Sequence, residues 1–69
     1  MYETFEEARE AANKFAGKYD VPPVVTENKL SKSARKTWYS FRFFVNEVFT
    51  PDWQQYEDRS WYRMIEIVA

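Results

Sequence analysis

The pattern of apolar and polar residues is clearest in Thr37–Val45, read as TWYSFRFFV, where five of nine residues are aromatic. Aromatic and β-branched residues favour an extended backbone, and alternate residues of a strand point to opposite sides. One side is wholly apolar and consists of Tyr39, Phe41, Phe43 and Val45. The other side is half polar and consists of Trp38, Ser40, Arg42 and Phe44. We expect the first side to face the core. The second side carries two large aromatic residues, Trp38 and Phe44, that a solvent-exposed face does not need.

A helix is predicted over residues 4–19. Thr4 and Glu7 have the spacing of a capping box, in which each side chain binds a backbone N–H group at the start of a helix. Gly17 lies near the predicted end, and the prolines at 22 and 23 prevent continuation. Apolar residues recur at helical spacing on one stripe: Phe5, Ala8, Ala12, Phe15, Ala16 and Tyr19. This stripe gives the helix one face to pack against a sheet.

Two further strands are predicted, Val24–Lys29 and Trp61–Val68. The first follows two prolines, which suits the edge of a sheet, and the turn at 31–33 lacks the residues that fix a tight hairpin. The second has mixed sides: Trp61, Ile65 and Ile67 alternate with Arg63 on one, and Tyr62, Met64 and Val68 alternate with Glu66 on the other. Apolar residues on both sides of a strand indicate a sheet whose second face is partly covered.

The order of these elements predicts an α+β fold, in which one N-terminal helix packs on a three-stranded antiparallel sheet. Thr37–Val45 is expected in the middle of the sheet, because strands that follow one another in sequence commonly pair. Between it and the last strand, Thr50 and Pro51 predict a short helical turn, with the threonine as cap. Residues 1–69 are expected to form a single domain, because so short a chain supports only one core.

The composition excludes several classes of function. The chain has no Cys and no His, so it lacks disulfides and the ligands that zinc, haem and iron–sulfur clusters prefer. A histidine-based catalytic triad and a cysteine nucleophile are absent for the same reason, and one glycine cannot build a glycine-rich phosphate loop. The acids at 47, 52, 57 and 58 are read as solvated side chains of a connection. We expect a non-enzymatic protein without metal or cofactor.

Charge is nearly balanced overall, at −1, but is unevenly distributed. Residues 28–46 hold five cations and no acid, whereas residues 47–69 hold five acids and two arginines. The first residues are polar and acidic, unlike a signal peptide, and no apolar run is long enough to span a bilayer. The sequence therefore predicts a cytoplasmic protein that does not associate with membranes.

The surplus of aromatic and cationic residues indicates a binding surface. Trp, Tyr and Arg are the side chains that most often anchor protein interfaces. The predicted contact face, opposite the helix, joins Trp38, Arg42, Phe44 and Tyr62, with Trp53 at its margin and Lys32, Arg35 and Lys36 steering an acidic partner. Two alternatives stay open: a single-stranded nucleic-acid binder that stacks bases on the aromatic residues, and a homodimer formed through the sheet. A third interpretation is that the connection 46–60 folds back and covers this face.

The chain also resembles a known class in its size and architecture. It combines a leading helix, FEEAREAANKF, with aromatic antiparallel strands, TWYSFRFFV and WYRMIEIV. In these respects it is similar to small phage-encoded inhibitor proteins, notably anti-CRISPR proteins. The resemblance covers the whole chain, rests on no motif and carries over no residue. It implies a protein that binds a host nuclease or defence complex in the host cytoplasm and blocks its nucleic-acid site.

Overall fold

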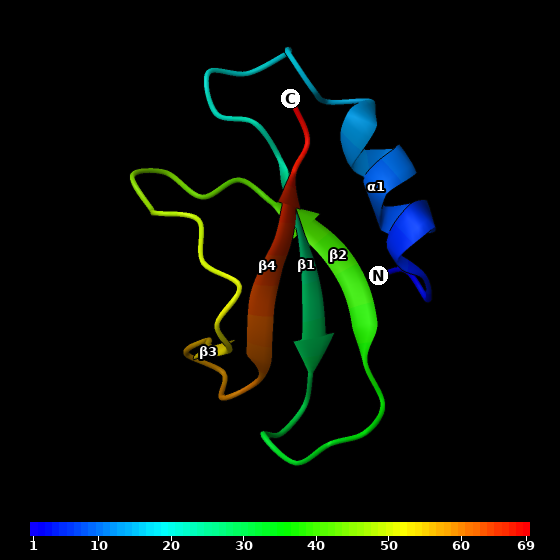
Figure 1. The fold of residues 1–69 in the computed structure, drawn as a ribbon, viewed down its shortest axis with the longest axis vertical. Helices are drawn as coiled ribbons and strands as arrows, with labels where there is room; N and C mark the ends of the chain where they lie inside the picture. Colours follow the sequence, from blue (N-terminus) through cyan, green and yellow to red (C-terminus); the bar gives the residue numbers. More distant parts are fainter.

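The computed structural model describes all residues 1–69 and contains one helix and four strands. The elements are α1 (Phe5–Asn13), β1 (Val24–Lys29), β2 (Trp38–Arg42), β3 (Gln54–Gln55) and β4 (Trp61–Ile67). The strands form one antiparallel sheet in the order β2-β1-β4-β3, and α1 packs against β1 and β2 (Figure 1). The α+β fold of a helix followed by an antiparallel sheet is therefore confirmed, with a fourth strand in addition to the three predicted.

The helix begins where the sequence predicts and ends earlier. The hydroxyl of Thr4 accepts a hydrogen bond from the N–H of Glu7 at 3.2 Å and donates to the Glu7 carboxylate at 3.0 Å. After Asn13 the backbone N–H groups bond three residues back, so the α-helix gives way to tighter turns. Gly17 has a φ of 79°, which only glycine adopts without strain. The helix is nine residues long, and no helix of the protein has the length and apolar character to cross a bilayer.

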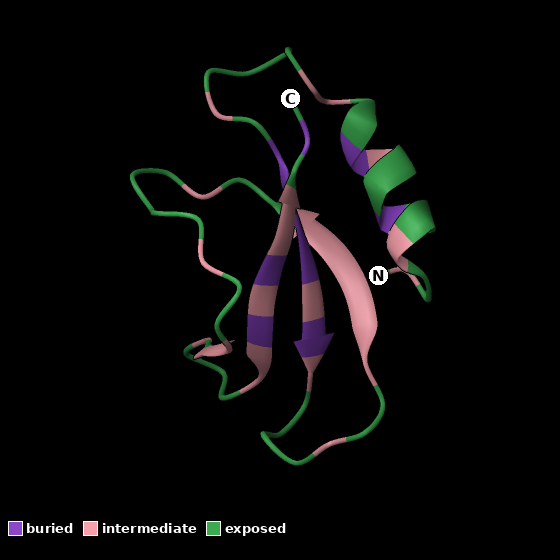
Figure 2. Cartoon of the chain, in the orientation of Figure 1, coloured by how far each residue is buried: buried purple, intermediate pink, exposed green.

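The order of the strands corrects two predictions. β2 was expected in the middle of the sheet and lies at its edge, whereas β1, expected at an edge, lies between β2 and β4. The two prolines do not prevent this, because both precede the strand, and the C=O of Pro23 even accepts a hydrogen bond from the N–H of Val68 at 2.9 Å. β1 is also the most buried strand, with Val25 and Thr26 fully enclosed (Figure 2).

A β-bulge in β4 explains why neither side of that strand is uniformly apolar. Val25 of β1 pairs with Glu66 and the next residue pairs with Met64, so Ile65 is one residue too many. An extra residue reverses the alternation of the side chains that follow it. Tyr62 and Met64 therefore point away from the helix, whereas Glu66 and Val68, predicted on the same side as they are, point toward it.

The sheet consequently separates two apolar clusters. The cluster under α1 has Ala8, Ala12, Val25 and Val68 as buried members, with Tyr2, Phe5, Ala16, Tyr39 and Phe41 packed against them. The cluster on the other face has Val24, Tyr62 and Met64 as buried members, with Phe44 and Tyr56 packed against them. Tyr39 and Phe41 thus face the helix as the alternation predicts. The N-terminal segment also touches the sheet through Tyr2, which exchanges two backbone hydrogen bonds of 2.8 Å with Tyr39 at the outer edge of β2.

The connection from β2 to β4 differs from the prediction. No helical turn follows Pro51; the Thr50 hydroxyl instead accepts a hydrogen bond from the N–H of Asp52, which closes a local turn. Gln54 and Gln55 then pair with Tyr62 and Trp61 to form β3, a short edge strand beside β4. The connection ends next to the last strand because its two glutamines complete a hairpin with it.

Candidate binding surface

The helix leaves part of its own face of the sheet uncovered. α1 packs on β1 and β2 and reaches β4 through the ion pair of Arg9 with Glu66. The other end of β4, near β3, therefore presents its side chains on that face without a helix above them. Five residues gather there, and we call them the tryptophan surface: Lys29, Lys32, Trp53, Trp61 and Arg63. Both tryptophans are half-buried. They therefore combine a fixed position with an accessible ring.

The pairing of strands brings these residues together. Lys29 of β1 lies opposite Trp61 of β4. Gln54 of β3 lies opposite Tyr62, so Trp53, just before β3, comes beside Arg63, just after Tyr62. The ammonium of Lys29 lies 4.0 Å from the centre of the Trp53 ring, and the guanidinium carbon of Arg63 lies 5.2 Å from it. Both distances are in the range of cation–π attraction. Trp53 is thus held between cations from two other strands.

Hydrogen bonds fix the cations themselves. The Arg63 Nε donates to Glu27 at 2.7 Å, and the same carboxylate accepts a hydrogen bond from the hydroxyl of Tyr39 at 3.1 Å. Lys29 donates to the C=O of Lys32 at 2.8 Å. The pKa of Tyr39 is raised, first because its hydroxyl is partly buried and second because it donates to Glu27. Side chains that are already ordered lose less entropy when a partner binds, so this surface is prepared for contact.

The charge around the tryptophan surface is positive although the whole chain is slightly acidic. The surface holds three cations, Lys29, Lys32 and Arg63, against one neighbouring acid, Glu27, which is already paired with Arg63. Since the chain carries −1 in total, the rest of the molecule is clearly acidic. The tryptophan surface therefore attracts negative groups in spite of the overall balance.

The contact face predicted from the sequence is not one open patch. The ring of Tyr56 stacks on Tyr62 with centroids 4.1 Å apart, and Phe44 stacks on the same ring at 5.6 Å. Tyr62 is only 7% exposed and belongs to the core, which corrects its assignment to an accessible surface. Arg42 stays exposed and lies with its guanidinium carbon 4.3 Å from the centre of the Tyr56 ring. The covered arrangement, left open by the sequence, is the one that the protein adopts.

Trp38 lies apart from the other aromatic residues of the predicted contact face. It lines a wide hollow of about 880 Å³ between the N-terminus and the β1–β2 loop, together with Leu30 and Lys36. The structure thus divides the eight predicted residues into three places. Lys32 and Trp53 lie in the tryptophan surface, Trp38, Arg35 and Lys36 lie along the β1–β2 loop and its end of β2, and Arg42, Phe44 and Tyr62 lie on the covered face.

A buried polar network lies within the covered face and escaped the sequence analysis. Thr26 and Asn28 of β1 are 0% and 2% exposed. The Thr26 and Ser40 hydroxyls are 2.9 Å apart, and the Asn28 amide donates to the Ser40 oxygen at 3.1 Å. The hydroxyl of Tyr56 is buried without a hydrogen-bond partner, and burial raises its pKa to about 12. The signal that could have found it is the spacing of the polar residues at 26, 28 and 40, which share one face of two neighbouring strands.

The acidic side chains do not form a metal-binding cluster. No three His, Cys, Asp or Glu side chains gather closely enough to hold a metal ion. The chain matches no protein-family model, no curated protein and no solved structure. A functional interpretation therefore rests on the geometry of the surfaces.

Proposed function

We propose that this chain is a non-enzymatic binding protein that acts by contact with a macromolecule through the tryptophan surface. The observation that carries the proposal is the position of Trp53, half-buried between Lys29 and Arg63 on a face that the helix leaves open. Large aromatic side chains and arginine dominate the binding energy of protein interfaces. Here both are ordered before any partner arrives, since Glu27 holds Arg63.

The chemistry of the surface points to an acidic protein partner. Cations that flank an apolar ring complement a partner surface in which carboxylates surround an apolar group. The carboxylates that hold catalytic metal ions in nucleases have this character. The most specific form of the proposal is therefore a phage-type inhibitor, similar to anti-CRISPR proteins, that binds a host nuclease or defence complex and blocks its nucleic-acid site. This form rests on the resemblance in size and architecture.

Single-stranded nucleic acid is the second candidate partner. The observation that favours it is the second tryptophan, Trp61, whose ring lies 5.9 Å from the ammonium of Lys32. Tryptophan rings next to cations bind single strands by stacking with bases and pairing with phosphates. The acidic character of the rest of the molecule opposes this mode, because affinity for the phosphate backbone depends on an excess of cations.

The test is an affinity capture from host lysate with the immobilised chain, with and without nuclease. Trp53→Ala is compared with the matched variant Trp38→Ala, which removes the same side chain from the opposite edge of the sheet. Binding that survives nuclease and is lost only in Trp53→Ala supports the proposal. Loss of all bound material after nuclease favours nucleic acid instead. A partner released by Trp38→Ala and retained by Trp53→Ala would show that the tryptophan surface is the wrong one.

A further inference from the structure

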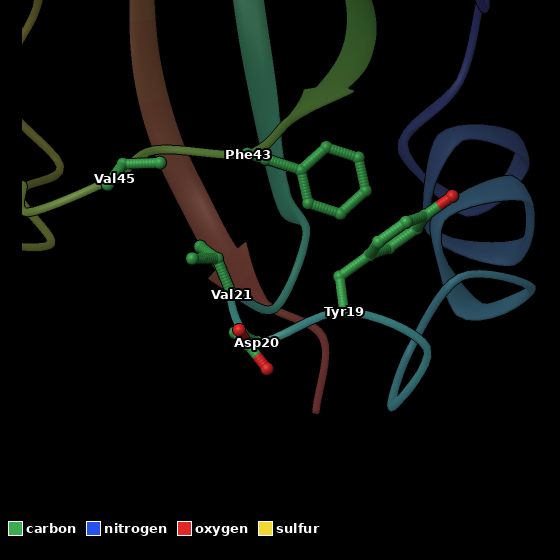
Figure 3. A pocket seen from close by; sticks show the side chains of 5 residues that line it. All are labelled: Tyr19, Asp20, Val21, Phe43 and Val45. Atoms are coloured by element: carbon green, nitrogen blue, oxygen red, sulfur yellow. The ribbon is translucent and has the colours of Figure 1, made fainter.

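One end of the sheet carries two adjoining hollows lined mainly by apolar side chains. Figure 3 shows the larger hollow, of about 350 Å³, which lies between the segment before β1 and the segment after β2. The smaller hollow, of about 130 Å³, shares Val21 with it and reaches the end of β4. We call the exposed apolar residues that line these hollows the sheet-end surface: Tyr19, Phe43, Val45, Phe49 and Ile67. Each of them is between 39% and 64% exposed.

The chain does not cover the sheet-end surface itself. The rings of Tyr19 and Phe43 meet edge to face with centroids 5.2 Å apart, so each holds the other in place while both stay accessible. The next residue, Phe44, stacks on Tyr62 in the cluster on the face opposite the helix. Phe43 and Val45, on either side of it in the sequence, remain outside that cluster. Apolar side chains that gather at one place and stay exposed mark a site of interaction.

Two carboxylates line these hollows, and no cation does. Asp20 lines the larger hollow and Glu47 lines the smaller one. Both residues are exposed, and neither takes part in the two ion pairs of the protein. The cations nearest to them in the sequence, Lys18 and Arg42, each lie against an aromatic ring that lines neither hollow. The sheet-end surface therefore combines apolar contact area with negative charge that no neighbouring cation compensates.

We infer that the sheet-end surface is a second binding site, which takes an apolar, basic segment of another protein. The apolar side chains of that segment fill the two hollows, and its lysines or arginines pair with Asp20 and Glu47. The same two carboxylates repel phosphate groups, which disfavours nucleic acids and membranes of anionic lipids as occupants. The charge of the site thus selects a cationic protein segment among the partners that apolar contact alone would allow.

This inference goes beyond the proposed function and does not depend on it, because the two surfaces lie at opposite ends of β1. Val24, the first residue of that strand, lines the smaller hollow, whereas Lys29, the last, belongs to the tryptophan surface. At about 3.3 Å per residue of strand, about 16 Å separates these two residues. The surfaces are also opposite in charge. The two sites therefore select different partners, an acidic one at the tryptophan surface and a basic one at the sheet-end surface.

The first test is an NMR titration of the isotope-labelled protein with a synthetic amphipathic peptide of leucines and lysines. The amide signals of residues 19–21 and 43–47 are expected to shift, with half-saturation at about 10–100 μM peptide. A control peptide with glutamate in place of each lysine is expected to bind about tenfold more weakly, because its charges are repelled. No shift of these amides up to about 1 mM peptide, or equal binding of the two peptides, would overturn the inference. Shifts of the same amides with the concentration of the protein alone would assign the surface to a second copy and would overturn it as well.

Val45→Arg tests the location of the site. It places a cation on the sheet-end surface at a residue that is 64% exposed, and it is expected to raise the dissociation constant of the leucine–lysine peptide by about tenfold or more. Val48→Arg is the matched control, since Val48 is 85% exposed and lines neither hollow. Equal effects of the two variants would exclude the sheet-end surface as the site.

The two carboxylates have a test of their own. Asp20→Asn combined with Glu47→Gln removes both charges and keeps the shapes of the side chains, and it is expected to weaken binding of the leucine–lysine peptide by about fivefold. Glu10→Gln combined with Glu57→Gln removes the same charge from exposed residues outside the hollows, and it is expected to leave binding nearly unchanged. Equal losses in both double variants would show that net charge alone attracts the peptide, which would overturn the inference.

Discussion

The ring of Tyr56 lies parallel to that of Tyr62, with centroids 4.1 Å apart and planes inclined by 21°. One ring comes from the connection between β3 and β4, and the other comes from β4 itself. Through this contact the connection becomes part of the second core rather than a loop over the surface. The consequence is that residues of a polar connection decide whether the face opposite the helix is covered.

Tyr56→Ala is expected to lower the free energy of unfolding by about 2–4 kcal/mol, the usual range for the loss of a large side chain packed in a core. The variant removes the stacking on Tyr62 and exposes Met64, which is 2% exposed in the intact protein. Urea denaturation followed by tryptophan fluorescence measures the change. A loss below about 1 kcal/mol would mean that the connection contributes no more than an ordinary surface segment.

Tyr56→Phe is expected to leave the protein equally stable or slightly more stable. The variant keeps the stacked ring and removes a hydroxyl that is buried without a partner, and burial of an unpaired polar group costs free energy. The same urea experiment compares it with the unmodified protein. A decrease of 1 kcal/mol or more would show that the hydroxyl makes a hydrogen bond in solution.

Stability is expected to fall as the pH rises from about 10 to about 12. The pKa of Tyr56 is raised from 10.0 to about 12 by burial, and burial also raises the pKa of Tyr39 and of Tyr62. A raised pKa means that the folded state holds its proton more firmly than the unfolded state, so the stabilisation is complete below pH 10 and is lost above it. Unfolding measured against pH, with tyrosinate absorbance as the readout, tests this. Tyr56→Phe is expected to show a smaller loss over the same range.

Glu27→Gln is expected to destabilise the fold by about 1–2 kcal/mol and to weaken binding at the tryptophan surface. Glu27 has a side chain that is only 13% exposed and that bonds to both Arg63 and Tyr39, and hydrogen bonds to charged groups contribute most. Glu66→Gln is the matched control, because the pair of Glu66 and Arg9 is more exposed and exposed ion pairs contribute little. Equal effects of both variants on stability would show that Glu27 contributes no more to the fold than a more exposed acid does.

The stability losses of Phe41→Ala and Trp38→Ala are expected to differ, because the two residues lie on opposite sides of β2. Phe41 packs against the cluster under the helix and meets Phe15 at 5.6 Å, so its loss is expected to cost about 3 kcal/mol of stability. Trp38 lines an open hollow at the end of the strand, and its truncation is expected to cost about 1 kcal/mol. Thermal and urea unfolding of both variants provide the comparison. Equal losses would place Trp38 in the core.

The sequence predicted the helix, the strands β1, β2 and β4 and the orientation of Tyr39 and Phe41, because these follow from local spacing alone. It could not predict the strand order. Two prolines in front of β1 suggested an edge strand, although both precede the strand. The burial of Thr26 and Asn28 in its middle depends on Ser40, a residue of another strand.

The candidate surface was only partly predictable for a similar reason. Lys32 and Trp53 were recognised as contact residues, but the cations beside Trp53 come from two strands, and one of them, β1, is distant in the sequence. The bulge at Ile65 was not predictable either. It moves the later side chains of β4 to the opposite face, and from the sequence alone this looks like a strand with apolar residues on both faces. Composition indicates that aromatic and cationic residues will meet, and only the topology decides which ones do.

The polar network of Thr26, Asn28 and Ser40 has a consequence for how the chain avoids misfolding. The loop between β1 and β2 carries no residues that dictate how the two strands align. If β2 slid by one position, Ser40 would turn to the helix side, and the buried Thr26 hydroxyl would lose its partner. An unmatched polar group in a dry interior is penalised far more than an unmatched methyl group. Three small polar residues therefore disfavour mispaired hairpins, because only the native register gives each of them a partner.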